Sequence, residues 1–95
     1  MYETCLTHEL RKRRLQAERQ VTLLVIYDGV TLEAGLRLDL LVERCVIVEL
    51  KSVEVVLPVH MAQVLTYLKL SGLRLALLIN FNVQLIKDGI MRIAL

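Results

Sequence analysis

The chain has 95 residues and a formal net charge of +2, which allows one small domain spanning residues 1–95 and no more. Its residues are 56% hydrophobic and its mean hydropathy is +0.56, so we expect either a core that is large for the length or apolar surface that meets a partner, such as a second copy in a homo-oligomer. The longest apolar runs, 21–27 and 73–81, fall far short of the roughly 20 residues of a membrane-spanning helix. The first residues lack the pattern of a secretory signal, and we therefore expect a cytoplasmic protein without a membrane partner.

The first predicted element is a helix from Tyr2 to about Gln16, because apolar residues recur at steps of three and four without Gly or Pro. A basic run, Arg-Lys-Arg-Arg at 11–14, lies near its C-terminal end. Two interpretations of this run remain open. It contacts nucleic-acid phosphates, or it is a solvated helix end offset by Glu3, Glu9 and Glu18.

A three-stranded meander is predicted next. Residues 21–27 are β-branched and aromatic, and Asp28-Gly29 is typical of a type I′ turn that leads into residues 30–32. Gly35 indicates a bulge or a bend in the second strand. The stretch 36–51 then reads as two alternating strands joined by a tight turn at 43–45, each strand with one wholly apolar face.

The charged face of this hairpin is its most informative feature. A three-residue loop sets Asp39 opposite Glu49 and Arg37 opposite Lys51. Two carboxylates about 5 Å apart at Cβ repel each other unless a cation lies between them, which is a first sign of a metal site. The alternative is a solvated outer face with alternating charges.

After Lys51 the hydrophobic period becomes helical, with Pro58 as a first-turn residue and Gly72 as a C-terminal stop. Residues 73–81 then predict a strand inside the sheet, reached by a crossover. A final hairpin of 83–86 and 90–94 is expected to turn through 87–89. The buried stripe of the helix is expected to contain Leu57, Met61, Val64, Leu65 and Leu68, with His60, Gln63 and Tyr67 on a neighbouring stripe.

Several motifs together resemble the GxxExxY family, small bacterial and archaeal proteins placed among the PD-(D/E)XK nucleases. Asp followed by Glu-x-Lys on two adjacent strands is the core pattern of that superfamily, and Gln-x-x-x-Tyr follows it in nucleases related to lambda exonuclease. Tyr2 takes the place of the tyrosine in the naming motif, and the Gly-x-x-Glu part before it is lacking. The matching stretches are Arg37-x-Asp39-Leu-Leu-Val42, Val48-Glu49-Leu-Lys51, His60-x-x-Gln63-x-x-x-Tyr67-Leu68, Leu77-Leu78-Ile79-Asn80-Phe81 and Lys87-Asp88-Gly89-Ile90-x-Arg92.

The resemblance implies an α/β fold with a mixed sheet, the restriction-endonuclease-like core. The implied order is helix-strand-strand-strand-helix-strand plus the C-terminal hairpin, with the first helix on one side of the sheet and the second helix packed against it. It also implies hard oxygen ligands for Mg²⁺ or Mn²⁺ from Asp39, Glu49 and the backbone carbonyl of Leu50. Lys51 would position the attacking water and offset phosphate charge.

By the same resemblance, Gln63 and Tyr67 complete the catalytic set by orienting the metal shell or the substrate strand, and Arg37 and His60 bind substrate. The implied function is metal-dependent hydrolysis of phosphodiester bonds in DNA or RNA. The alternative is a catalytically silent binding or assembly module with the nuclease fold. Other chemistries find little support, because the sequence has no Gly-rich phosphate loop and no zinc-ligand spacing.

Overall fold

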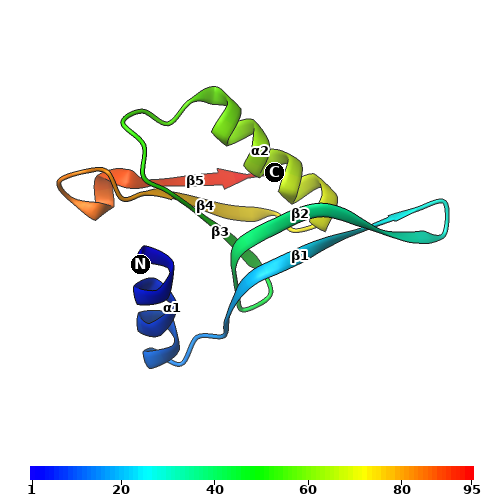
Figure 1. Ribbon diagram of the computed structural model, residues 1–95, viewed down its shortest axis with the longest axis horizontal. Coiled ribbons are helices and arrows are strands. Elements are labelled where there is room, and N and C mark those ends of the chain that lie inside the picture. Colours follow the sequence, from blue (N-terminus) through cyan, green and yellow to red (C-terminus); the bar gives the residue numbers. More distant parts are fainter.

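A five-stranded mixed sheet with one helix on each face forms the protein (Figure 1). The structure is a computed structural model that describes the backbone of residues 1–95 and all side chains except those at positions 26, 27, 33 and 34. The strands lie in the order β1-β2-β3-β4-β5, with β3 and β4 parallel and the other neighbours antiparallel. The elements are α1 (Tyr2–Lys12), β1 (Ala17–Tyr27), β2 (Val30–Val42), β3 (Val46–Lys51), α2 (Pro58–Ser71), β4 (Leu75–Asn80), the 3₁₀ turn η1 (Ile86–Gly89) and β5 (Ile90–Ala94). The predicted α/β class with a mixed sheet is confirmed.

The turns of the meander have the predicted conformations. Asp28 and Gly29 have φ values of 51° and 74°, as a type I′ turn requires. At the second turn, Glu43 and Arg44 both have φ of 52°, and the strand ladder closes at Val42 and Val46. The connection therefore has three residues, and the register it imposes is the one that places residue 39 across from residue 49.

Apolar clusters lie on both faces of the sheet. The sequence predicted that each strand of the charged hairpin has one wholly apolar face. The cluster under α2 is the larger one, and Leu40, Val48 and Ile79 form a second cluster on the α1 side. Leu38 was expected beside Leu40 but joins the α2 side. On the neighbouring strand, Gln20 has φ of 52° and no partner in the β1–β2 pairing, which keeps the same register from Arg19–Leu40 to Val21–Leu38. The α2-side cluster contains Leu23, Leu38, Leu41, Ile47, Val64, Tyr67, Leu68, Ala76, Leu78 and Ile93.

The second helix begins and ends where the sequence predicted. Pro58 is its first residue, and Gly72 follows its end with φ of 77°. The predicted buried stripe is confirmed except at Leu57, which is 48% exposed. Leu57 precedes the helix in an extended conformation and so does not share the helical period. In the described part of the chain, no helix is long and apolar enough to cross a bilayer.

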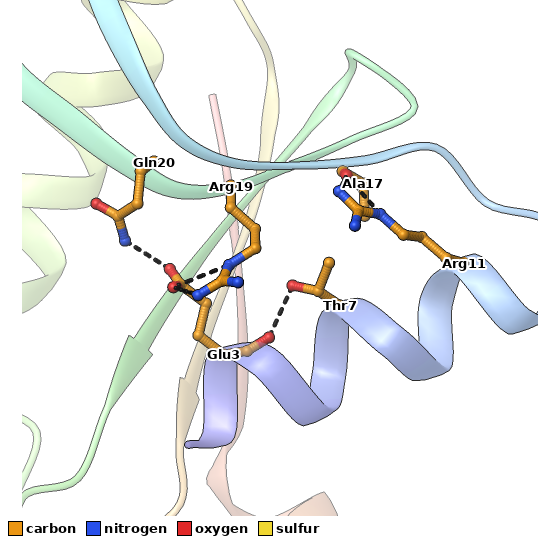
Figure 2. A network of polar contacts seen from close by, with 6 residues as sticks. All are labelled: Glu3, Thr7, Arg11, Ala17, Arg19 and Gln20. Carbon is orange, nitrogen blue, oxygen red and sulfur yellow. Dashed lines mark hydrogen bonds and ion pairs between the residues drawn. The ribbon is translucent and has the colours of Figure 1, made fainter.

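The first helix is shorter than predicted and is fastened to β1 by polar contacts (Figure 2). It ends at Lys12, and Arg14 adopts φ of 66° as the chain turns toward the sheet. Arg19 donates to Glu3 Oε2 at 2.8 Å and Gln20 donates to Glu3 Oε1 at 2.6 Å. At the other end of the helix, Arg11 donates to the backbone carbonyl of residue 17 at 2.8 Å.

The predicted C-terminal hairpin is wrong. Residues 83–85 are bends and not a strand, and β5 pairs with β4 instead. The physical reason lies in the register of β4, whose apolar strand offers β5 a continuous ladder from Leu75–Ala94 to Ile79–Ile90. Gly89 allows the turn before β5 to pack on the end of β4, because a Cβ at this position would overlap the Asn80 carbonyl oxygen.

The contacts of Glu3 predict a stability that depends on pH. Partial burial acts to raise the pKa of Glu3, but the hydrogen bonds from Arg19 and Gln20 and the charge of Arg19 outweigh it and hold the pKa below its usual value. A lowered folded-state pKa contributes stability above the unfolded pKa, and this stability is lost as the pH falls through the folded value. We expect Glu3→Gln to cost about 1 to 2 kcal/mol at about pH 7 and less at about pH 3, measured by urea unfolding.

The matched control is Glu9→Gln. The Glu9–Arg13 pair is exposed and spans 3.6 Å, so its loss should change the free energy of unfolding by less than about 0.5 kcal/mol. A Glu3→Gln cost that is equal at both pH values would show that the carboxylate charge does not hold α1 to β1.

Self-association stays a prediction, and the structure suggests where to test it. β1 is an outer strand of the sheet, and the hairpin that it forms with β2 extends beyond both helices (Figure 1). This hairpin exposes Leu24, Val30 and Leu32, and long apolar edge strands pair readily with other chains. Light scattering during size-exclusion chromatography should give a dimer mass that Leu24→Lys reduces to a monomer. A wild-type monomer at high concentration contradicts the prediction.

Candidate active site

Asp39 and Glu49 face each other at the point where β2 and β3 separate. The backbone pairing of these strands extends from Val42–Val46 to Leu40–Val48. One residue further, the side chains replace the ladder. The backbone N–H of Asp39 donates to Glu49 Oε1 at 3.2 Å, and the backbone N–H of Leu50 donates to Asp39 Oδ2 at 2.9 Å. The two carboxyl groups therefore lie together, as the sequence predicted, and Asp39 and Glu49 form an acidic pair.

The buried position of Glu49 determines its protonation. Its side chain is 4% exposed, and burial, followed by the negative charge of Asp39, raises the pKa of Glu49 to about 8. The Asp39 backbone N–H and the Lys51 ammonium act in the opposite direction without overcoming these effects. Glu49 is thus protonated at neutral pH in this arrangement, and a cation beside the pair would favour its ionised form.

The second helix carries a hydroxyl group to the same place. Tyr67 is buried, and Gln63, one helical turn before it, donates from Nε2 to the Tyr67 hydroxyl at 2.9 Å. Burial, then the charges of Glu49 and Asp39, raise the pKa of Tyr67. The charges of Asp39 and Glu49 therefore reach the Tyr67 hydroxyl, to which Gln63 is bonded; the roles that the resemblance implies for Gln63 and Tyr67 stay predictions.

A cleft of 330 Å³ lies beside the acidic pair on the α1 side of the sheet. Lys51 is two residues after Glu49 on β3 and is among the residues that line this cleft, as is Asp39, whereas Glu49 is not among them. The backbone N–H of Phe81 donates to the Lys51 carbonyl at 2.8 Å, which holds the end of β3 to the end of β4. The remaining lining residues are Met1, Tyr2, Glu3, Leu50, Ser52 and Phe81.

Two residues expected to bind substrate lie in other settings. Arg37 is exposed on β2 and pairs with Thr22 of β1, and the β2–β3 ladder ends before it would place Arg37 opposite Lys51. His60 accepts a hydrogen bond at Nδ1 from the backbone N–H of Leu57 at 3.0 Å and so caps α2. The basic run 11–14 lies at the opposite end of α1 from Tyr2, roughly 15 Å along the helix axis.

Sequence reasoning missed the residues that shape the cleft. Asn80 is 5% exposed; its Nδ2 donates to the Val53 carbonyl at 2.8 Å and its Oδ1 accepts from the Val53 N–H at 3.1 Å. It thereby holds the loop that follows Lys51. A lone amide at the end of an otherwise apolar strand was the available signal. Glu3 also lines the cleft, but its carboxylate is occupied by Arg19 and Gln20.

The donor set fits a hard divalent cation in its chemistry. Asp39 and Glu49 supply carboxylate oxygens. The Leu50 N–H donates to Asp39 of β2, and the Leu50 carbonyl points toward the same strand. Mg²⁺ is commonly held by one or two carboxylates, with water and substrate oxygens filling the other positions. The described residues contain no group of three or more His, Cys, Asp or Glu side chains arranged for a metal, so the protein would supply only part of the coordination shell.

Comparison with protein-family models identifies the superfamily of the chain. No curated protein and no solved structure matches the chain. The family model of the PD-(D/E)XK nuclease superfamily matches residues 1–93. The acidic pair, Lys51 and the Gln63–Tyr67 pair all lie within that match, and the chain belongs to the PD-(D/E)XK nuclease superfamily.

Proposed function

We propose that this protein is a metal-dependent nuclease that hydrolyses phosphodiester bonds in DNA or RNA. The observation that carries the proposal is the pair of carboxyl groups of Asp39 and Glu49, fixed across two separating strands with Lys51 at the mouth of a cleft. Divalent metals are in general use in this superfamily. We also propose that the chain is one of its GxxExxY members, with Tyr2 at the cleft, and that it acts in the cytoplasm.

The proposed metal is Mg²⁺ or Mn²⁺, held by Asp39, Glu49 and the Leu50 carbonyl. Such an ion lowers the pKa of a coordinated water and stabilises the charge that grows on the scissile phosphate. The Lys51 ammonium would orient the attacking water and offset phosphate charge from inside the cleft. Gln63 donates to the Tyr67 hydroxyl, and the two side chains would orient the ligand shell or the substrate strand.

A catalytically silent module with the same fold is the second candidate. The contacts of Glu3 favour it, because the α1 carboxylate that lines the cleft is bound to Arg19 and Gln20. The raised pKa of Glu49 also favours it, because a protonated carboxyl group is a poor metal ligand. Measurements of cleavage and of metal binding separate the two candidates.

The first test is cleavage of labelled single- and double-stranded DNA and RNA with Mg²⁺ or Mn²⁺. We expect Glu49→Gln and Lys51→Ala each to lower the rate by about 100-fold or more, because each removes a group that acts on the transition state. Lys69→Ala and Glu54→Gln alter exposed residues away from the cleft and should cleave like the wild type. Equal cleavage by wild type and both site variants would assign the activity to another site or a contaminant.

The second test measures how pH and metal change the stability of the protein, and it requires no cleavage. The pKa of Glu49 is raised on folding, so the metal-free protein should lose stability as the pH rises from about 4.5 to about 8, by up to about 1.4 kcal/mol for each pH unit in that interval. Glu49→Gln should remove this slope. Millimolar Mg²⁺ or Mn²⁺ should raise the Tm, and more so at the higher pH, because binding requires the ionised carboxylate.

Asp39→Asn is the companion variant in these melts. It keeps an acceptor for the Leu50 N–H but removes one of two crowded charges. We expect the metal-free protein to be as stable as the wild type or more so, and most of the metal-induced shift to disappear. A wild type that gains nothing from metal at either pH, with a neutral Asp39→Asn, would remove the physical basis of the metal site.

A further inference from the structure

Two aromatic rings from opposite ends of the chain stack at the rim of the cleft. The Tyr2 and Phe81 ring centroids are 4.3 Å apart, and the ring planes differ by 1°. Tyr2 is the first residue of α1, and Phe81 directly follows β4. The chain has only four aromatic residues, three Tyr and one Phe, so half of them lie at this one place.

The ring pair lines the same cleft as two of the candidate catalytic residues. Tyr2 and Phe81 line the 330 Å³ cleft together with Asp39 and Lys51. The hydrogen bond from the Phe81 N–H to the Lys51 carbonyl holds the backbones of these two residues side by side. A cleft of this volume lies within the range that small ligands occupy and has room for a nucleotide.

Tyr2 is accessible to a ligand even though it is stacked. Half of its surface, 50%, is exposed, whereas Tyr67 is 5% exposed. An exposed ring stacked on a second ring is a flat, rigid surface of the kind on which nucleobases stack, and each such contact contributes substantially to single-strand binding.

We propose that Tyr2 and Phe81 form a platform on which an unpaired nucleobase stacks, so that the cleft takes single-stranded nucleic acid. The proposal rests on the nuclease function above and names its substrate class. A base inside a duplex is already stacked on its neighbours and cannot reach a platform within a cleft without being extruded.

The distribution of charge supports a single strand over a duplex. Duplex binding depends on many Lys and Arg contacts to phosphates. Lys51 is the cationic side chain among those that line the cleft, and the net charge of the chain is only +2. The basic run 11–14 is distant, and in it Arg11 bonds the Ala17 carbonyl and Arg13 pairs with Glu9. Aromatic stacking therefore has to supply affinity that charge does not.

The test is binding in metal-free buffer with EDTA, where no cleavage occurs. The probe is an oligonucleotide containing 2-aminopurine, whose fluorescence is quenched when the base stacks, offered as a single strand and as a duplex. We expect the wild type to quench and bind the single strand and to bind the duplex at least about tenfold more weakly. Tyr2→Leu and Phe81→Leu should each weaken single-strand binding by about tenfold, and Tyr2→Phe, which keeps the ring, should bind like the wild type.

Leu57→Ala is the matched control, because Leu57 is 48% exposed and lies outside the cleft lining, and it should not change binding. The Tm of every variant separates binding from folding. If the stack serves only to seat α1 on the sheet, Tyr2→Leu will lower the Tm and leave the affinity unchanged, which overturns the proposal. Absence of quenching by the wild type, which needs no variant, also overturns it, as does equal affinity for single strand and duplex.

The same experiment separates this proposal from the nuclease function. Quenching and ring-dependent binding without cleavage in any metal would support the platform and remove the nuclease. Cleavage of single strands by the wild type that is unchanged in Tyr2→Leu and Phe81→Leu would retain the nuclease and remove the platform.

Discussion

Two hydrogen bonds between β2 and β3, from the Asp39 N–H to Glu49 and from the Leu50 N–H to Asp39, are the contacts on which the rest of the site depends. Each residue's position is fixed by backbone N–H groups of the opposite strand, because the Asp39 N–H reaches Glu49 and the Leu50 N–H reaches Asp39. These bonds replace the ladder at the point where β2 and β3 separate. The carboxyl groups thus satisfy backbone donors that the separating strands would otherwise leave without partners, and they do so while facing each other.

This arrangement joins the stability of the sheet to the charge of the site. Burial and the Asp39 charge raise the pKa of Glu49 to about 8, so the folded protein holds a proton that the unfolded chain would release at neutral pH. Raising the pH therefore works against the fold, because the Lys51 ammonium does not compensate the second negative charge. In the proposed metal site, the low exposure that makes two negative charges costly would also strengthen the attraction for a divalent ion.

Local patterns predicted the elements whose conformation is decided by neighbouring residues. Asp28-Gly29 set one turn, the three residues 43–45 set the register of the acidic pair, and Pro58 and Gly72 marked the ends of α2. The pattern failed where distant partners compete. Hydrophobicity in residues 83–86 alternates as in a strand, but β5 forms its backbone hydrogen bonds with β4 instead. The Tyr2–Phe81 stack joins positions that no short-range period relates, and only the fold brings them together.

Glu3 is a carboxylate beside the cleft that stabilises the fold and is not free to bind a metal. Its carboxylate lines the cleft, where it would add a third negative charge, but Arg19 and Gln20 of β1 bind it first. Those bonds hold the start of α1 against the sheet, and the start of α1 is where Tyr2 meets Phe81. Freeing the carboxylate would remove the bonds that hold the start of α1, while Arg11 would still hold its other end to the Ala17 carbonyl. In the proposed metal site, Asp39 and Glu49 would thus be the two carboxyl groups left for the ion, while Glu3 positions the start of α1, and the rest of the metal shell would come from water and substrate oxygens.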